Sequence, residues 1–186
     1  MDTKKANKRS FYCMILGIIL ILLGVVIFIA TDQNNKNMID KQNTEIILER
    51  YKVFTEDASN YNEMKDQFED KVLGISVLTE IDDNYDAYVN YLEEYIGSMD
   101  KIDEDSKELK ELCINHTYKD ENAIKNCARF VLAYETAYNL LVNGLKEYNT
   151  LITNYNETYP ETAKNVVEDK YTNYIDFNGD GNYVGK

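Results

Sequence analysis

Oxygen-bearing side chains recur at every second position near the end of the chain. Within residues 176–182, the side chains of Asp176, Asn178, Asp180 and Asn182 alternate with phenylalanine or glycine. Carboxylate and amide oxygens at this spacing can surround a hard cation such as Ca²⁺, while an intervening glycine permits the sharp bend. The segment therefore predicts a cation-binding turn.

This spacing resembles the first half of an EF-hand or dockerin-type calcium loop, D-x-[DN]-x-[DN]-G. The resemblance implies that Asp176, Asn178 and Asp180 take the first, third and fifth ligand positions and that Asn182 offers its carbonyl oxygen. The bidentate acid of the twelfth position would fall beyond Lys186, so we expect calcium to bind weakly, with a Kd of ~10⁻⁴–10⁻³ M or above. An ordinary glycine turn and a short β-hairpin remain open as alternatives.

Two cysteines flank a predicted turn at residues 117–120. Cys113 and Cys127 are placed symmetrically about residue 120. In an antiparallel helical hairpin, positions equidistant from the turn lie side by side, which suits a disulfide. The spacing predicts a Cys113–Cys127 bridge, with two buried thiols as the alternative.

The remaining chemistry is sparse. His116 is the only histidine, so a centre built from several histidines is excluded. It falls at the end of a predicted helix, where a positive charge interacts favourably with the helix dipole. The sequence contains no HExxH motif, no phosphate-binding glycine loop and no nucleophile elbow. We therefore predict that the protein is not an enzyme.

Apolar side chains recur by threes and fours in three long stretches. Helices are expected over residues 38–79, over residues 83–115 and over a third stretch that contains Phe130 and ends before Pro160. Residues 103–106 are expected to kink or interrupt the second helix, and residues 82–84 to cap its start. Short connections make successive helices antiparallel neighbours. The fold class predicted is all-α: an elongated, coiled-coil-like, antiparallel three-helix bundle.

Residues 11–30 form an uncharged apolar run preceded by four basic residues. A helix of this length reaches ~30 Å, the thickness of a bilayer core. Basic flanking residues favour the cytoplasmic side. The pattern predicts a signal anchor in a single-pass cell-membrane protein, with the N-terminus cytoplasmic and the rest extracytoplasmic. A cleaved signal peptide is the alternative, but Phe28 would then occupy a position that needs a small residue.

These features divide the chain into five predicted segments. They are a basic cytoplasmic segment at 1–10, a transmembrane helix at 11–30, a polar linker at 31–37, a helical bundle at 38–158 and a short irregular tail at 159–186.

The net charge of −13 disfavours nucleic acid and favours basic partners. We therefore expect a non-enzymatic binding or scaffolding module at the cell envelope. Its expected partners are the membrane and either another envelope protein or a second copy bound through helix faces. The alternative is a sensor ectodomain, or an accessory subunit of a membrane complex, modulated by calcium.

Overall fold

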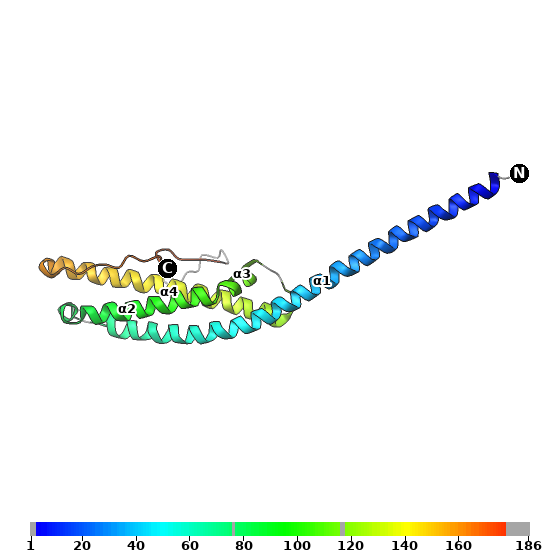
Figure 1. The fold of residues 1–186 in the computed structure, drawn as a ribbon. Helices are drawn as coiled ribbons and strands as arrows, with labels where there is room; N and C mark the ends of the chain where they lie inside the picture. The colour runs from blue at the N-terminus through cyan, green and yellow to red at the C-terminus, as the bar shows by residue number, and fades with distance from the viewer. Residues whose placement is uncertain (1–2, 76, 116–117, 178–186) are drawn as a thin grey trace. The chain divides into compact units, whose positions relative to one another are not determined.

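The computed structural model describes residues 3–75, 77–115 and 118–177, with only the main chain for residues 3–30 and 32. All regular structure in these ranges is helical (Figure 1). The elements are α1 (Thr3–Phe68), the π-helical turn η1 (Glu69–Leu73), α2 (Glu80–Asp105), α3 (Lys107–Asn115), α4 (Glu121–Thr158) and the short 3₁₀ helix η2 (Pro160–Thr162). The prediction of an all-α fold is confirmed for the described residues.

The chain divides into two compact units, Met1–Asn43 and Thr44–Lys186. Helix α1 belongs to both, because it continues past Asn43 as far as Phe68. The second unit contains all the other helices.

The predicted membrane anchor is not supported. Among the residues that the structure describes, no helix combines the length and the apolar character that crossing a bilayer requires. The helix that includes residues 11–30 does not end with the apolar run but continues through the polar residues 31–37. The single-pass topology, the cytoplasmic N-terminus and the cell-membrane localisation inferred from that run are therefore corrected and play no further part.

In the second unit, the end of α1 lies beside α2 and α4 (Figure 1). Buried side chains recur every seven residues on each helix, which keeps one seam of each helix facing its neighbours. The repeats are Ile47, Phe54, Tyr61 and Phe68 on α1; Ile81, Tyr88, Tyr95, Ile102 and Leu109 along α2 and α3; and Cys127, Tyr134, Leu141, Tyr148 and Tyr155 on α4. The predicted helical bundle is confirmed.

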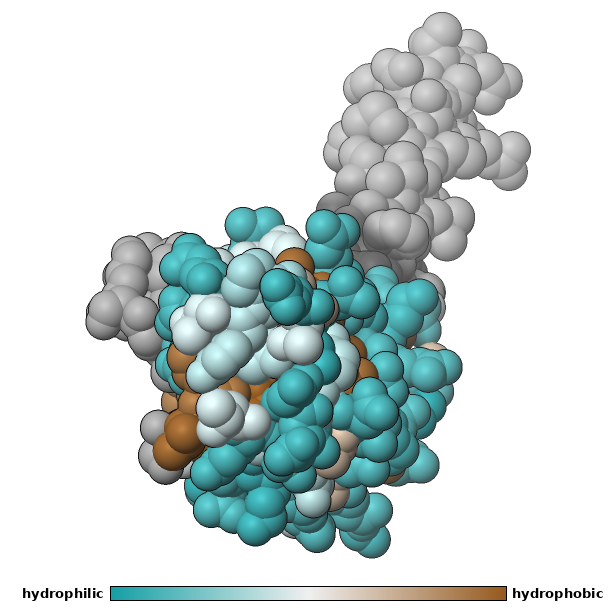
Figure 2. Space-filling model, turned by 90° about the vertical axis from the view of Figure 1, so that its left-hand side faces the viewer, coloured by the Kyte–Doolittle hydropathy of each residue, from teal (hydrophilic) through white to brown (hydrophobic). Residues whose placement is uncertain are grey.

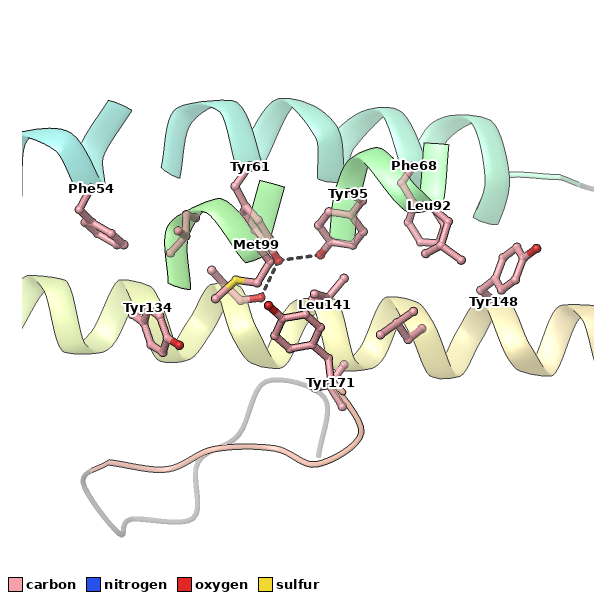
Figure 3. Packing of buried hydrophobic residues seen from close by; sticks show 14 of the residues in the cluster. Phe54, Tyr61, Phe68, Leu92, Tyr95, Met99, Tyr134, Leu141, Tyr148 and Tyr171 are labelled. Carbon is pink, nitrogen blue, oxygen red and sulfur yellow. Dashed lines mark hydrogen bonds between the residues drawn. The ribbon is translucent and has the colours of Figure 1, made fainter. Parts of the chain in front are cut away.

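Aromatic rings fill much of this core (Figure 3). Phe54 and Phe130 meet edge to face, with ring centroids 4.8 Å apart. The hydroxyl of Tyr61 donates to the carbonyl oxygen of Ala137 at 2.5 Å. A carbonyl can only accept, so the 2.7 Å bond between Tyr61 and Tyr95 has the Tyr95 hydroxyl as its donor. These bonds satisfy two hydroxyls inside the core.

The start of α2 differs from the prediction, whereas the predicted interruption at residues 103–106 is present at the end of this helix. Helix α2 begins at Glu80, with Thr79 as an N-cap that makes no side-chain capping bond. The expected cap at residues 82–84 is wrong, because these residues already lie inside the helix, with Asp82 and Asp83 in its first turn. The helix is interrupted at Ser106, whose main-chain N–H bonds the carbonyl oxygen of Ile102 at 3.0 Å.

Helix α4 has well-defined ends. Asp120 caps its start, where the carboxylate accepts the N–H groups of Asn122 at 2.9 Å and Ala123 at 3.0 Å. The helix ends at Thr158, ahead of Pro160, as predicted. After η2 the chain turns back and runs along α4 (Figure 1). We call residues 163–177, which carry no helix or strand, the strap.

Candidate functional site

Three asparagines of α4 hold the main chain of the strap. Each side-chain amide donates to the carbonyl oxygen of one strap residue and accepts the N–H of the same residue. The pairs are Asn156 with Lys164 (2.8 and 2.7 Å), Asn149 with Val167 (2.8 and 2.8 Å) and Asn139 with Ile175 (2.9 and 2.9 Å). Such a clamp bonds main-chain groups and not the side chain. It therefore accepts any residue except proline, which lacks the N–H.

The first two clamps match the dimensions of a helix lying against an extended chain. From Asn149 to Asn156 the helix advances ~10.5 Å at the α-helical rise. From Lys164 to Val167 an extended chain covers ~10 Å. The two lengths agree, so an antiparallel strap can satisfy both clamps without distortion.

Between the second and third clamps the lengths differ, and the strap leaves the straight path. The helix advances ~15 Å from Asn139 to Asn149, whereas the strap residues between their partners could span ~26 Å. The surplus lets Tyr171 turn inward, where it is 2% exposed. Its hydroxyl donates to Asp100 at 2.6 Å, and its ring meets Tyr138 edge to face. Burial, and then the bond to Asp100, raises the pKa of Tyr171.

Further along, the strap is held by side chains of α4. The Tyr174 hydroxyl donates to the side-chain oxygen of Asn143. The Lys146 ammonium lies 3.9 Å from the centroid of the Tyr174 ring, within the range of a cation–π interaction. The buried carboxylate of Glu135 accepts the N–H of Phe177 at 3.0 Å. The strap is therefore bound over its whole described length.

Helix α2 contacts the strap as well, through two ion pairs. Lys164 pairs with Asp82 and Lys170 with Asp100, each at 2.8 Å. The hydrogen bond to Asp82 raises the pKa of Lys164, and the same bond lowers the pKa of Asp82. Both pairs are partly solvated, so they direct the strap more than they stabilise it. We call the surface that contacts the strap the strap groove: Asp82, Tyr85 and Asp100 on α2 and Glu135, Asn139, Asn143, Asn149 and Asn156 on α4.

A cavity of about 530 Å³ lies where the described strap ends, against α3 and α4. Three of its polar lining residues bond one another: Lys110 contacts Asp103 at 2.7 Å, and the Tyr134 hydroxyl donates to the same carboxylate. Burial opposes ionisation of Asp103, but the bonds from Lys110 and Tyr134 outweigh it and lower the pKa. These three groups satisfy one another.

The predicted calcium ligands are only partly covered by the structure. Asp176 lies on the strap, half-buried. Asn178, Asp180 and Asn182 lie outside the described residues, and His116 does too. Within the described ranges no three acidic, histidine or cysteine side chains gather as metal ligands would. Calcium binding stays a prediction.

The two cysteines lie together as predicted. Cys113, near the end of α3, and Cys127, in α4, form a disulfide with Cα atoms 5.0 Å apart. The bridge ties the short helix α3 to α4 beside the cavity.

Sequence reasoning missed the strap groove, although one signal was present. Asparagine disfavours helix interiors, because its amide competes for main-chain groups. Helix α4 nevertheless carries Asn139, Asn143, Asn149 and Asn156 within its length. Repeated asparagines inside a long amphipathic helix indicate amides with partners elsewhere.

No protein family, curated protein or solved structure matches this chain. Its class is therefore defined by its own fold and groove: an all-α bundle that holds an extended segment by its main chain.

Proposed function

We propose that this protein is a non-enzymatic binding module whose strap groove holds extended peptide segments, with the strap as its occupant in cis. The observation that supports this most directly is the set of three asparagine clamps. Each satisfies both main-chain polar groups of one strap residue, and none requires a particular side chain.

The arrangement follows the physical logic of extended-peptide recognition. Main-chain hydrogen bonds give affinity, and a few side-chain contacts select the sequence. Here Asn149 and Asn156 supply main-chain bonds, while Asp82 and Asp100 select side chains with a cation or a hydroxyl. The acidic character of the chain also favours basic segments.

The strap buries fewer side chains than the helices of the core do. Tyr171 is its one fully buried side chain among the described residues, while Val166 is 46% and Phe177 38% exposed. Segments with few buried apolar contacts open locally at low free energy. A strap of this kind can leave the groove while the bundle stays folded, which makes the groove accessible to another segment.

A cleavable hinge tests the proposal in the full-length chain. A protease site is inserted between Thr162 and Ala163, both exposed, so that cleavage leaves the strap held without a covalent link. A fluorescent synthetic peptide of residues 163–177 is then added and its anisotropy measured. We expect saturable binding to the cleaved protein. Binding to the uncut protein should be weaker by about tenfold or more, because the tethered strap competes at high effective concentration.

N-methylated peptides provide the matched control. Methylation of the Val167 nitrogen removes the donor to Asn149 and should weaken binding by about fivefold to tenfold, the value of one net hydrogen bond. Methylation of the neighbouring Val166, which makes no hydrogen bond in the described structure, should have a smaller effect. Absence of saturable binding, or equal affinity of the two peptides, would contradict the proposed function.

A further inference from the structure

We propose that two copies of this chain exchange their straps, so that each strap groove holds residues 163–177 of the other copy. The inference rests on the proposed function, because it needs a groove that binds a strap supplied in trans. It adds the identity of that partner.

The connection between α4 and the strap suits such an exchange. The chain reverses direction within the hinge, residues 159–162, whose side chains are exposed. The bonds that hold it closed are local. The N–H of Tyr159 donates to the carbonyl oxygen of Tyr155 at 2.8 Å, and the N–H of Thr162 donates to that of Tyr159 at 3.2 Å. The hydroxyls of Tyr155 and Thr162 meet at 2.6 Å, and the ring centroids of Tyr155 and Tyr159 lie 5.2 Å apart. Pro160 has no N–H to contribute. A short hinge held by few bonds can straighten at low cost, which is a usual route to the exchange of an identical segment between two copies.

The side-chain contacts favour the chain's own sequence as the occupant. The strap groove matches a lysine at position 164 with Asp82, a buried tyrosine at 171 with Asp100, and a second tyrosine at 174 with Asn143. A second copy presents these groups at the required spacing. Every strap contact would be preserved in the exchanged form, so only the hinge and the free energy of association differ between the two forms.

The exchange also produces a closed assembly of two copies. Each copy gives one strap and receives one, which produces a two-fold symmetric dimer with no groove left over. The balance between closed monomer and exchanged dimer is then set by chain concentration and by the length of the hinge.

Hinge length therefore supplies the test, read by sedimentation velocity of the full-length chain over a concentration series. Deleting Glu161 and Thr162 hinders closure in cis and should strengthen dimerisation by about tenfold or more. Inserting about six Gly and Ser residues after Thr162 eases closure in cis and should weaken dimerisation to a similar degree. Asn149→Ala should weaken the dimer of the deletion variant, whereas Asn154→Ala, at an exposed position of the same helix, should leave it unchanged.

The outcomes distinguish the strap exchange from the peptide-binding function. The exchange would be overturned by a dimer constant that does not change with hinge length, by a dimer of the deletion variant that Asn149→Ala leaves unchanged, or by monomers in every variant. If the labelled strap peptide still binds the cleaved protein, the peptide-binding function stands without it. If the peptide does not bind, both fail. Should the deletion variant not fold, the insertion variant decides the question, because an unchanged dimer constant in that variant would overturn the exchange.

Discussion

Asn149 and Val167, 18 residues apart in sequence, are joined by two hydrogen bonds of 2.8 Å. The amide of a helical residue thereby takes the place that a neighbouring strand would have in a sheet. The strap has no sheet to join, and these bonds satisfy a main chain that would otherwise depend on water.

Asn149→Ala should release the middle of the strap. Removing both bonds costs about 1–3 kcal/mol, and about 1.4 kcal/mol corresponds to a tenfold change in an opening equilibrium. The Val167 amide should therefore exchange its hydrogen about tenfold faster or more, measured by mass spectrometry. Asn154→Ala, at an exposed position of α4, is the control. Equal exchange in both variants would mean that the clamp does not hold the strap.

The buried seam gives a prediction about packing. Phe130 is 0% exposed and lies edge to face with Phe54. Phe130→Ala leaves a cavity and should lower the free energy of unfolding by about 3–5 kcal/mol. Leu132→Ala, two positions along at a residue 63% exposed, should change it by less than about 0.5 kcal/mol. Urea denaturation measures both, and similar values would contradict the observed phase of the helix.

The sequence predicted best those features that depend on local patterns of residues. Phe130, the break at Ser106 and the end of α4 before Pro160 follow from apolar spacing and from proline, which are local properties. The bridge between Cys113 and Cys127 follows from symmetry about one turn. These features need no knowledge of distant contacts.

The strap could not be predicted in the same way. Its binding depends on main-chain groups, which every residue has, so residues 163–177 carry no periodic signal. Its partners on α4 are distant in sequence, as Asn139 and Ile175 show. The start of α2 was misplaced because Asp82 resembles a cap, although it lies in the first turn, where an acid is also favourable.

Two glycines give opposite predictions for the same substitution. A Cβ at Gly97 would meet nothing within 4 Å, so Gly97→Ala should stabilise α2 by about 0.5–1 kcal/mol through helix propensity. A Cβ at Gly144 would lie 3.2 Å from the Phe68 ring and 3.3 Å from the Tyr95 ring. Those rings are fully buried and cannot move away easily, so Gly144→Ala should destabilise the bundle. Thermal unfolding compares the two, and stabilisation by both would show a loosely packed core.

Reduction of the disulfide should lower stability without abolishing the fold. Cys113 and Cys127 close a loop with a sequence separation of 14. Loss of the bridge should cost about 3 kcal/mol in the chain-entropy model. The Cys113→Ala/Cys127→Ala variant should match the reduced protein in urea denaturation. If reductant leaves the midpoint of the native chain unchanged, the two thiols are not bridged in the purified protein.

The buried tyrosines predict a loss of stability in alkali. Burial is the main cause that raises the pKa of both Tyr61 and Tyr95 above the ordinary value of 10.0. The folded state therefore keeps these protons at a pH where the unfolded state has released them. The resulting stabilisation is complete below pH ~10, and each tyrosine should then lose up to about 1.4 kcal/mol per pH unit above it.

Urea midpoints measured from pH 8 to pH 12 check this sign. Tyr95→Phe should be less stable than the native chain near neutral pH, by about 1 kcal/mol for the lost bond to Tyr61. The deficit should shrink above pH ~10, because one tyrosine that opposes ionisation is gone. A deficit of constant size across the whole range would show that Tyr95 ionises as freely in the folded bundle as in the unfolded chain.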